Sequence, residues 1–124
     1  MISNKFLIIA SGILGFLAVS FGAFGAHFLK DGISLEQLNI FQTGVLYHLI
    51  HSVVVMAIAV MKNSKFYTAA VFFIVGIILF SFSLYVYSVT QVQIFAMITP
   101  LGGISFLAGW LLIIVEGAKT KISS

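Results

Sequence analysis

The sequence predicts an all-α protein, a membrane-embedded bundle of four antiparallel helices with both termini in the cytoplasm. The first observation is composition: 61% of the 124 residues are hydrophobic and only 7% are charged. An ordinary soluble domain has about 45–50% apolar and about 25% charged residues. A chain this short has too little interior to hide so much apolar surface from water. The second and third observations are four long apolar stretches and an uneven distribution of lysines.

The four apolar stretches predict transmembrane helices over residues 6–28, 40–61, 66–88 and 94–115. Each is close to the roughly 20 residues that a helix needs to cross a bilayer. Transmembrane strands would instead alternate in segments of about 10 residues, and these stretches are continuous. The polar connections at 62–65 and 89–93 are short, which predicts antiparallel neighbours. We interpret residues 1–124 as a single membrane domain.

The first predicted helix is rich in small residues on one face. Its start resembles a secretory signal, but signal cores contain 7–15 apolar residues and this stretch is longer. We therefore interpret it as a membrane-spanning helix. Small residues let helix backbones approach in lipid, where no hydrophobic force holds helices together. The stripe consists of Ser11, Gly15, Ala18, Gly22 and Gly25.

The second predicted helix begins outside the hydrocarbon and contains two histidines. Ser34 followed by Gln37 is a capping-box pattern, so the helix is expected to start near Leu35. His51 lies ten residues before Met61, or about 15 Å along a helix, which is near the middle of the bilayer. Residues three and four apart share a helix face. Gly44, His48, His51 and Val55 therefore form one stripe.

The third and fourth predicted helices offer partners for this stripe. In the third, Ser81, Tyr85 and Ser88 share a face that suits the histidine-bearing helix. The fourth repeats the small-residue pattern with Gly102, Ser105 and Gly109. Pro100 is expected to free the carbonyl of Ala96, which the Thr99 hydroxyl or a neighbouring helix would then satisfy. A broken helix is also a transporter feature, but the sequence shows no paired interruption in two halves.

The lysines predict orientation. Five of the six lysines lie beside the N-terminus, the second connection and the C-terminus, and only Lys30 lies on the other side. Positively charged residues concentrate on the cytoplasmic side of membrane proteins. Both termini are therefore expected in the cytoplasm.

Ionisable residues inside a membrane are costly and usually face the bundle interior. A zinc site needs at least three good ligands, and no acid lies at the depth of the histidines. His48 and His51 share a face, so they cannot bind one haem iron from opposite sides. The remaining interpretations are a path for a proton or small solute and a hydrogen-bonded network that fixes helix packing. We expect no cofactor and no bound metal.

Other classes of function are excluded by missing residues. The chain has no cysteine, which excludes disulfides and thiolate chemistry. No serine has a carboxylate-backed histidine nearby, and no acid pair is present, so an enzyme is not expected. Basic residues are too few and too scattered for a nucleic-acid surface.

Several motifs together resemble a known family. They are Gly22-Ala23-Phe24-Gly25-Ala26-His27, the Tyr-x-x-x-His of Tyr47 and His51, Phe80-Ser81 with Leu84-Tyr85, Thr99-Pro100-Leu101-Gly102-Gly103, and Gly109-Trp110. In this order and spacing the chain, from about Ile8 to Leu112, resembles the small bacterial membrane proteins of uncharacterised protein family 0382. That family is also called domain of unknown function 423 and is similar to a small vertebrate transmembrane protein family.

The resemblance implies four transmembrane helices and a cell-membrane location, and it implies no established activity. It places His51 and His27 on motif positions and His48 on an open position. Phe82 stands where the family usually has glycine, which argues against close helix approach at that point. The interpretation is therefore that His51 has a fixed role and that His48 is incidental.

These observations predict a non-enzymatic membrane protein with a structural or accessory role. The alternative is a binder or conduit for a small solute or proton through the bundle interior. The expected partners are membrane lipids and a second copy of the chain. The candidate interior polar cluster is His27, Tyr47, His51, Ser81, Tyr85 and Thr99, and the expected helix-packing glycines are Gly15, Gly22, Gly25, Gly102 and Gly109.

Overall fold

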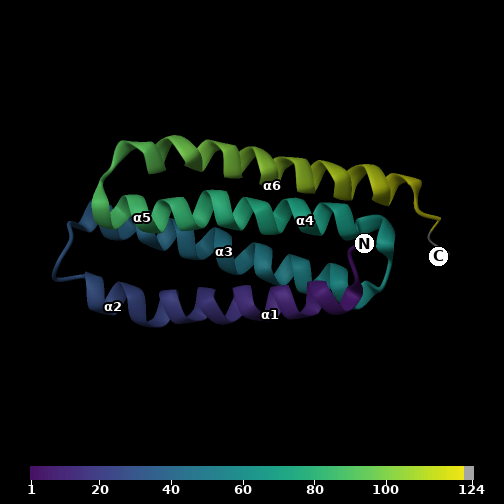
Figure 1. The fold of residues 1–124 in the computed structure, drawn as a ribbon, viewed down its shortest axis with the longest axis horizontal. Coiled ribbons are helices and arrows are strands. Elements are labelled where there is room, and N and C mark those ends of the chain that lie inside the picture. The colour runs from purple at the N-terminus through teal and green to yellow at the C-terminus, as the bar shows by residue number, and fades with distance from the viewer. Residues whose placement is uncertain (122–124) are drawn as a thin grey trace.

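The computed structural model describes residues 1–121 and consists of long helices joined by short connections (Figure 1). Four helical segments are long and apolar enough to cross a membrane: Asn4–Leu29, Leu35–Met61, Ser64–Thr90 and Gln93–Lys119. Each predicted span lies inside one of these segments, and the helices extend a few residues beyond the apolar stretches. The prediction of an all-α protein with four transmembrane helices is confirmed.

Two of the four spans are interrupted by single π-helical turns. The first span consists of α1 (Asn4–Ser20), the π-turn η1 (Phe21–Gly25) and α2 (Ala26–Leu29). The second is the continuous α3 (Leu35–Met61), and the fourth is the continuous α6 (Gln93–Lys119). The third consists of the 3₁₀ turn η2 (Ser64–Phe66), α4 (Tyr67–Gly76), the π-turn η3 (Ile77–Ser81) and α5 (Phe82–Thr90). A π-turn shifts the helix face by one residue, so it changes which side chains point toward a neighbour.

The start of α3 has the capping box that the sequence predicts. The Ser34 hydroxyl accepts a hydrogen bond from the Gln37 backbone N–H at 3.1 Å, and the Gln37 side chain accepts one from the Ser34 N–H at 3.0 Å. The Gln37 amide also donates to the Ser88 carbonyl at 2.8 Å. The Gln37 side chain thus helps to cap the start of α3 and links it to the end of α5.

The four spans pack as a flattened diamond. In Figure 1, α1 and α6 lie on opposite outer sides, with α3 and α4–α5 between them. The helix α1 packs along α3, while α6 packs along α4, η3 and α5, and α3 packs against the third span. The other two sides, α1 facing α5 and α3 facing α6, are lined by grooves. Smaller grooves, of about 280 and 230 Å³, also lie along the α1–α3 side and along the side between the third span and α6. The bundle is therefore more open on the α1–α5 and α3–α6 sides than on the other two.

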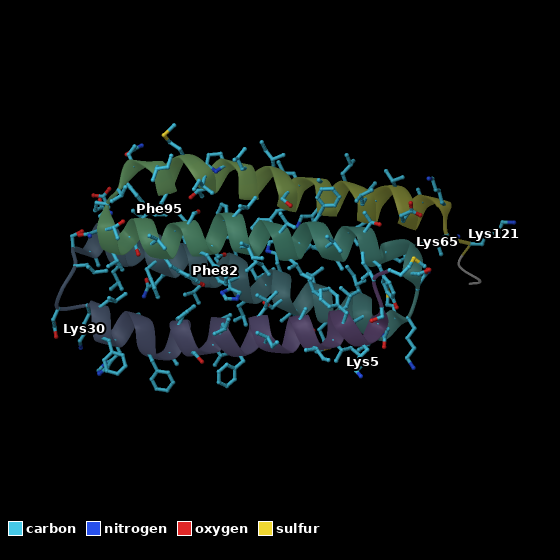
Figure 2. All side chains as sticks on the ribbon, viewed as in Figure 1. Lys5, Lys30, Lys65, Phe82, Phe95 and Lys121 are labelled. Atoms are coloured by element: carbon cyan, nitrogen blue, oxygen red, sulfur yellow. The ribbon has the colours of Figure 1, made fainter. Side chains whose placement is uncertain are left out.

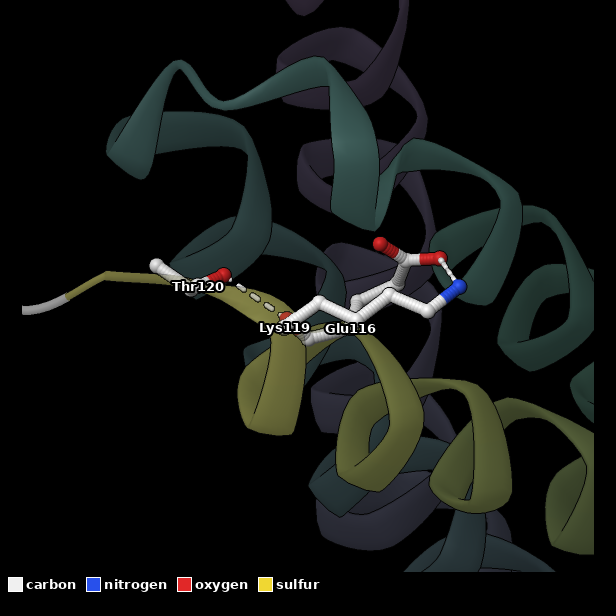
Figure 3. A network of polar contacts seen from close by, with 3 residues as sticks. All are labelled: Glu116, Lys119 and Thr120. Atoms are coloured by element: carbon white, nitrogen blue, oxygen red, sulfur yellow. Dashed lines mark hydrogen bonds and ion pairs between the residues drawn. The ribbon is translucent and has the colours of Figure 1, made fainter.

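Charged residues gather at the two ends of the bundle. Lys5, Lys65 and Lys121 lie at the end that holds both termini, and Lys30 lies at the opposite end (Figure 2). Glu116 is at the terminal end as well, where Lys119 Nζ lies 3.9 Å from its carboxylate and the Thr120 hydroxyl donates to its carbonyl at 2.7 Å (Figure 3). An exposed ion pair of this kind contributes little stability. The cytoplasmic location of this end stays a prediction.

The glycines of α6 allow the closest helix contact in the bundle. A Cβ added at Gly102 would collide with the backbone of Leu79 and Phe80 in η3. At Gly109 an added Cβ would lie 2.6 Å from the Phe73 ring. Both glycines therefore let α6 pack directly against the third span.

The glycines of the first span divide into two groups. An added Cβ would lie 2.6 Å from Phe41 at Gly25 and 3.1 Å from Val45 at Gly22, so these two pack against α3. Gly15 differs from the expectation, because an added Cβ there would meet nothing within 4 Å. Gly15 instead borders a small groove between α1 and α3, so it makes no close helix contact.

Candidate functional site

His48 and Tyr85 form a buried pair between the second and third spans. His48 has no exposed surface, and its Nδ1 lies 2.8 Å from the Tyr85 hydroxyl. Gly44 makes room for this contact, because an added Cβ there would lie 2.8 Å from the Tyr85 ring. The predicted sharing of a face by Gly44 and His48, and the predicted approach of Tyr85 to that face, are both seen.

Aromatic rings close the space around the His48–Tyr85 pair. Phe82 packs edge-on against the His48 ring with centroids 5.4 Å apart, and Phe21 packs edge-on against Tyr85 at 5.0 Å. Phe82 itself is half-buried and borders two surface grooves. The Nε2 atom of His48 and the hydroxyl of Ser81 are buried without a hydrogen-bond partner among residues 1–121. The surroundings of the pair are therefore apolar, and Tyr85 also borders the groove between α1 and α5.

His51 joins the second span to the fourth. Its Nε2 lies 3.1 Å from the Trp110 indole nitrogen, and its Nδ1 lies 2.7 Å from the Tyr47 carbonyl oxygen one turn earlier. The ring stacks on Phe106, with centroids 3.8 Å apart and planes inclined by 12°. His51 therefore holds α6 against α3 by one hydrogen bond and one stacked ring.

The two hydrogen-bond partners of His51 determine the tautomer of its imidazole ring. A carbonyl only accepts a hydrogen bond and an indole N–H only donates one. The Nδ1 of His51 must therefore carry the proton, and Nε2 must accept from Trp110. This is a neutral imidazole with both nitrogens occupied, so it has no free position for a metal or a substrate proton.

Further hydrogen bonds cross the helix interfaces. The hydroxyls of Ser83 and Thr99 share a hydrogen bond of 2.6 Å between α5 and α6. The Ser105 hydroxyl donates to the Phe72 carbonyl at 2.7 Å, and the Asn4 amide donates to the Ala59 carbonyl. Thr99 also bonds to the Phe95 carbonyl at 3.1 Å, which differs from the expectation that it satisfies Ala96.

The structure does not bring the six residues of the predicted cluster together. Tyr85 belongs to the His48 pair, Thr99 bonds to Ser83, and Ser81 is buried without a partner. Tyr47 lies beside His51 but is 40% exposed. His27 is exposed at the end of the first span, where it packs against Phe28, so the expected interior position is not seen. The polar residues form several separate contacts instead of one site.

Two side chains that make interhelical contacts were missed or set aside by sequence reasoning. His48, interpreted as incidental, is more deeply buried than His51. Trp110 was given no role, although it is the single tryptophan of the chain. Their similar depth in the membrane could have predicted the contact between Trp110 and His51. Trp110 lies nine residues before the end of α6, and His51 lies ten before the end of α3. Both helices run in the same direction, and an indole N–H in lipid needs a partner.

A groove runs along the open side between α3 and α6 and has a volume of about 500 Å³. We call it the α3–α6 groove; it is lined by Tyr47, His51, Phe80, Pro100, Gly103, Ile104, Phe106, Leu107 and Trp110. Trp110 also borders a second, wholly apolar groove of about 440 Å³ on the terminal side. The Trp110–His51 contact therefore separates two lipid-facing grooves.

The described residues hold no evident set of metal ligands. Within residues 1–121, no three His, Asp or Glu side chains gather closely enough to hold a metal ion. In the same part of the chain, the only ion pair is between Lys119 and Glu116, far from both buried histidines. The arrangement can therefore donate and accept hydrogen bonds between neutral groups.

Comparisons with known proteins agree with this architecture. The family described as "Protein of unknown function (DUF423)" matches residues 21–103. The UPF0382 inner membrane protein YgdD of Escherichia coli (strain K12) is 37% identical over 123 residues, covering 96% of this chain and 94% of the relative. The UPF0382 membrane protein YwdK of Bacillus subtilis (strain 168) is 41% identical over 120 residues, covering 93% and 98%.

No solved structure matches the chain. The family match covers more than half of the sequence, and both relatives are similar over nearly their whole length. Their names describe membrane proteins, in agreement with the four helices that are long and apolar enough to span a membrane. The chain is therefore a multi-pass cell-membrane protein that belongs to the uncharacterised DUF423 (UPF0382) family.

Proposed function

We propose that this protein is non-enzymatic and has a structural or accessory role in the cell membrane. One observation carries the proposal: polar side chains at bilayer depth pair one span with another. His48 pairs with Tyr85, His51 with Trp110, and Ser83 with Thr99. Such interhelical hydrogen bonds contribute about 0.6 kcal/mol each on average in membrane proteins. A catalytic site would instead leave a nucleophile or a base free to meet a substrate.

A conduit for a proton or small solute is the second candidate. The observation in its favour is the pair of buried atoms without partners, His48 Nε2 and Ser81 Oγ. A conduit also needs a hydrated path that reaches one side of the membrane. The grooves of the described chain open sideways toward lipid and have mainly apolar walls. This geometry favours the structural role.

The proposed partners follow from the exposed surface. Large apolar side chains cover the outer faces of the first and fourth spans, including Phe16, Phe24, Leu107 and Leu111. Membrane lipids are the partners that suit these faces. A second copy of the chain is proposed as a further partner on α1, where Gly15 leaves the helix surface open.

The test compares two histidine variants. His51→Ala removes the stacked ring and leaves the Trp110 N–H without its acceptor, so we expect the free energy of unfolding to fall by about 1–3 kcal/mol. His27→Ala is the matched control, because His27 is exposed and should change stability by less than about 0.5 kcal/mol. Unfolding from a mild detergent, followed by helix content, measures both.

A different outcome would favour the conduit. If His51→Ala keeps the stability of the original protein but abolishes proton flux into vesicles that contain it, the structural proposal is contradicted. Equal loss of stability in both histidine variants would also contradict it, because the buried contact would then have no special importance.

A further inference from the structure

The α3–α6 groove contains one polar group that the fold leaves unused. Tyr47 lines the groove and is 40% exposed. The only side-chain hydrogen bond to Tyr47 within residues 1–121 goes to its backbone carbonyl, from His51. Its hydroxyl therefore has no protein partner.

The depth of Tyr47 makes this free hydroxyl costly. Tyr47 lies 14 residues before the end of α3 at Met61, which is about 21 Å along the axis. It thus lies inside the roughly 30 Å hydrocarbon core. The ring is kept at this depth by Phe80 and Phe106, whose centroids lie 4.6 and 6.1 Å away. In hydrocarbon, an unpaired hydroxyl costs several kcal/mol.

The walls of the groove limit what can satisfy the hydroxyl. No charged residue lines the groove, so a charged ligand would remain without a counter-ion. Phospholipid ester oxygens lie in the headgroup region, and their chains offer only methylene groups at this depth. The rings of Phe106, Phe80 and Trp110 suit a flat molecule. A volume of about 500 Å³ is within the usual range of small-molecule sites.

We propose that the α3–α6 groove binds a neutral, lipid-soluble molecule with a flat ring and a carbonyl oxygen, the chemistry of a membrane quinone. Its ring packs against Phe80 and Trp110, which line the groove, and its carbonyl accepts a hydrogen bond from the Tyr47 hydroxyl. The molecule enters from the side, since Ile104 and Leu107 on the rim are 62% and 69% exposed to the lipid. This site goes beyond the structural role proposed above and does not depend on it.

The fluorescence of Trp110 can report binding in the groove. Trp110 is the single tryptophan of the chain and lines the groove. Quinones quench indole fluorescence at short range. We would titrate 2-methyl-1,4-naphthoquinone into the protein in a mild detergent and follow this fluorescence. A tryptophan derivative in the same detergent measures quenching without a site. Saturable quenching of the protein alone is the expected result.

Two variants test where the probe binds. Tyr47→Phe removes only the hydroxyl and should weaken binding by about 3- to 10-fold, the usual effect of one lost hydrogen bond. Tyr87→Phe is the matched control, because Tyr87 does not line the groove, and it should bind as the original protein does. Gly103→Leu should abolish saturable quenching, since Gly103 lines the groove and an added Cβ would meet only the Phe80 ring, at 4.0 Å, which leaves the longer side chain to fill the groove. An unchanged unfolding temperature shows that this variant is folded.

Other outcomes would overturn the proposal. Quenching that is linear and equal to that of the free derivative means that no site exists. Equal binding of Tyr47→Phe and the original protein removes the role of the hydroxyl. If 2-methylnaphthalene, which lacks the carbonyls, competes as strongly as the quinone, the groove holds an acyl chain. If the protein is a dimer and binds no probe, a second copy covers the groove.

Discussion

Two histidines only three positions apart have different partners. His48 contacts Tyr85 of the third span, and His51 contacts Trp110 of the fourth. Three residues leave a helix about 60° short of a full turn, so the two rings share the buried face of α3 but lean toward the neighbours on its two sides. Both histidines are therefore expected to matter for stability, and His48 is the more deeply buried of the two.

The His48–Tyr85 pair predicts a loss of stability when the phenol oxygen is removed. Tyr85→Phe keeps the ring contacts but leaves Nδ1 of His48 without its only partner. We expect the free energy of unfolding to fall by about 1–3 kcal/mol. Tyr87→Phe should be nearly neutral, because within residues 1–121 the Tyr87 side chain makes no hydrogen bond; only its backbone carbonyl accepts, from the Gln91 backbone and side chain. Detergent unfolding measures both, and equal stability of the two variants would show that His48 needs no partner.

At the level of the elements, the π-turns and glycines determine how closely the spans approach. The π-turn η3 lies where Gly102 of α6 meets the backbone of Leu79 and Phe80. In the first span, the π-turn η1 contains Gly22 and Gly25, which pack against α3. Each outer span thus meets its central neighbour through glycine at or beside a π-turn.

Gly102→Ala is predicted to force α6 away from the third span. Its methyl group would overlap backbone atoms, which cannot rotate aside as a side chain can. The expected loss is about 1–3 kcal/mol, typical of overpacking. Gly15→Ala is the control, because it has open space and gains helix propensity, so stability should stay level or rise slightly. Unfolding temperatures of the two variants measure the difference, and an equal loss in both would contradict the close backbone contact.

At the level of the whole molecule, the diamond arrangement leaves two sides open to lipid and separates the charges by end. The open sides contain the grooves, one bridged by Trp110 and His51 and the other by Phe21 and Tyr85. The terminal end carries Lys5, Lys65 and Lys121, and the opposite end carries Lys30 (Figure 2). This asymmetry is the basis for the predicted orientation.

Orientation can be measured directly because the chain has no cysteine. Asp31→Cys and Ser64→Cys each place one thiol in an exposed connection, at opposite ends of the bundle. We expect an impermeant maleimide to label Asp31→Cys in intact cells and Ser64→Cys only after the membrane is opened. The reverse pattern would place both termini outside the cytoplasm.

The sequence by itself determined the number of helices, their limits to within a few residues, the capping box at Ser34, and the family. These features depend on local composition and on residues close together in the sequence. Local sequence is enough to predict a span because, in a bilayer, each span must form its backbone hydrogen bonds within its own helix. The tertiary structure alone decided which polar side chains pair between the spans. It separated the expected polar cluster, placed His27 at the exposed end, buried His48 and joined His51 to Trp110. The physical reason is that helix rotation, local π-turns and the open sides of the diamond depend on packing between distant residues.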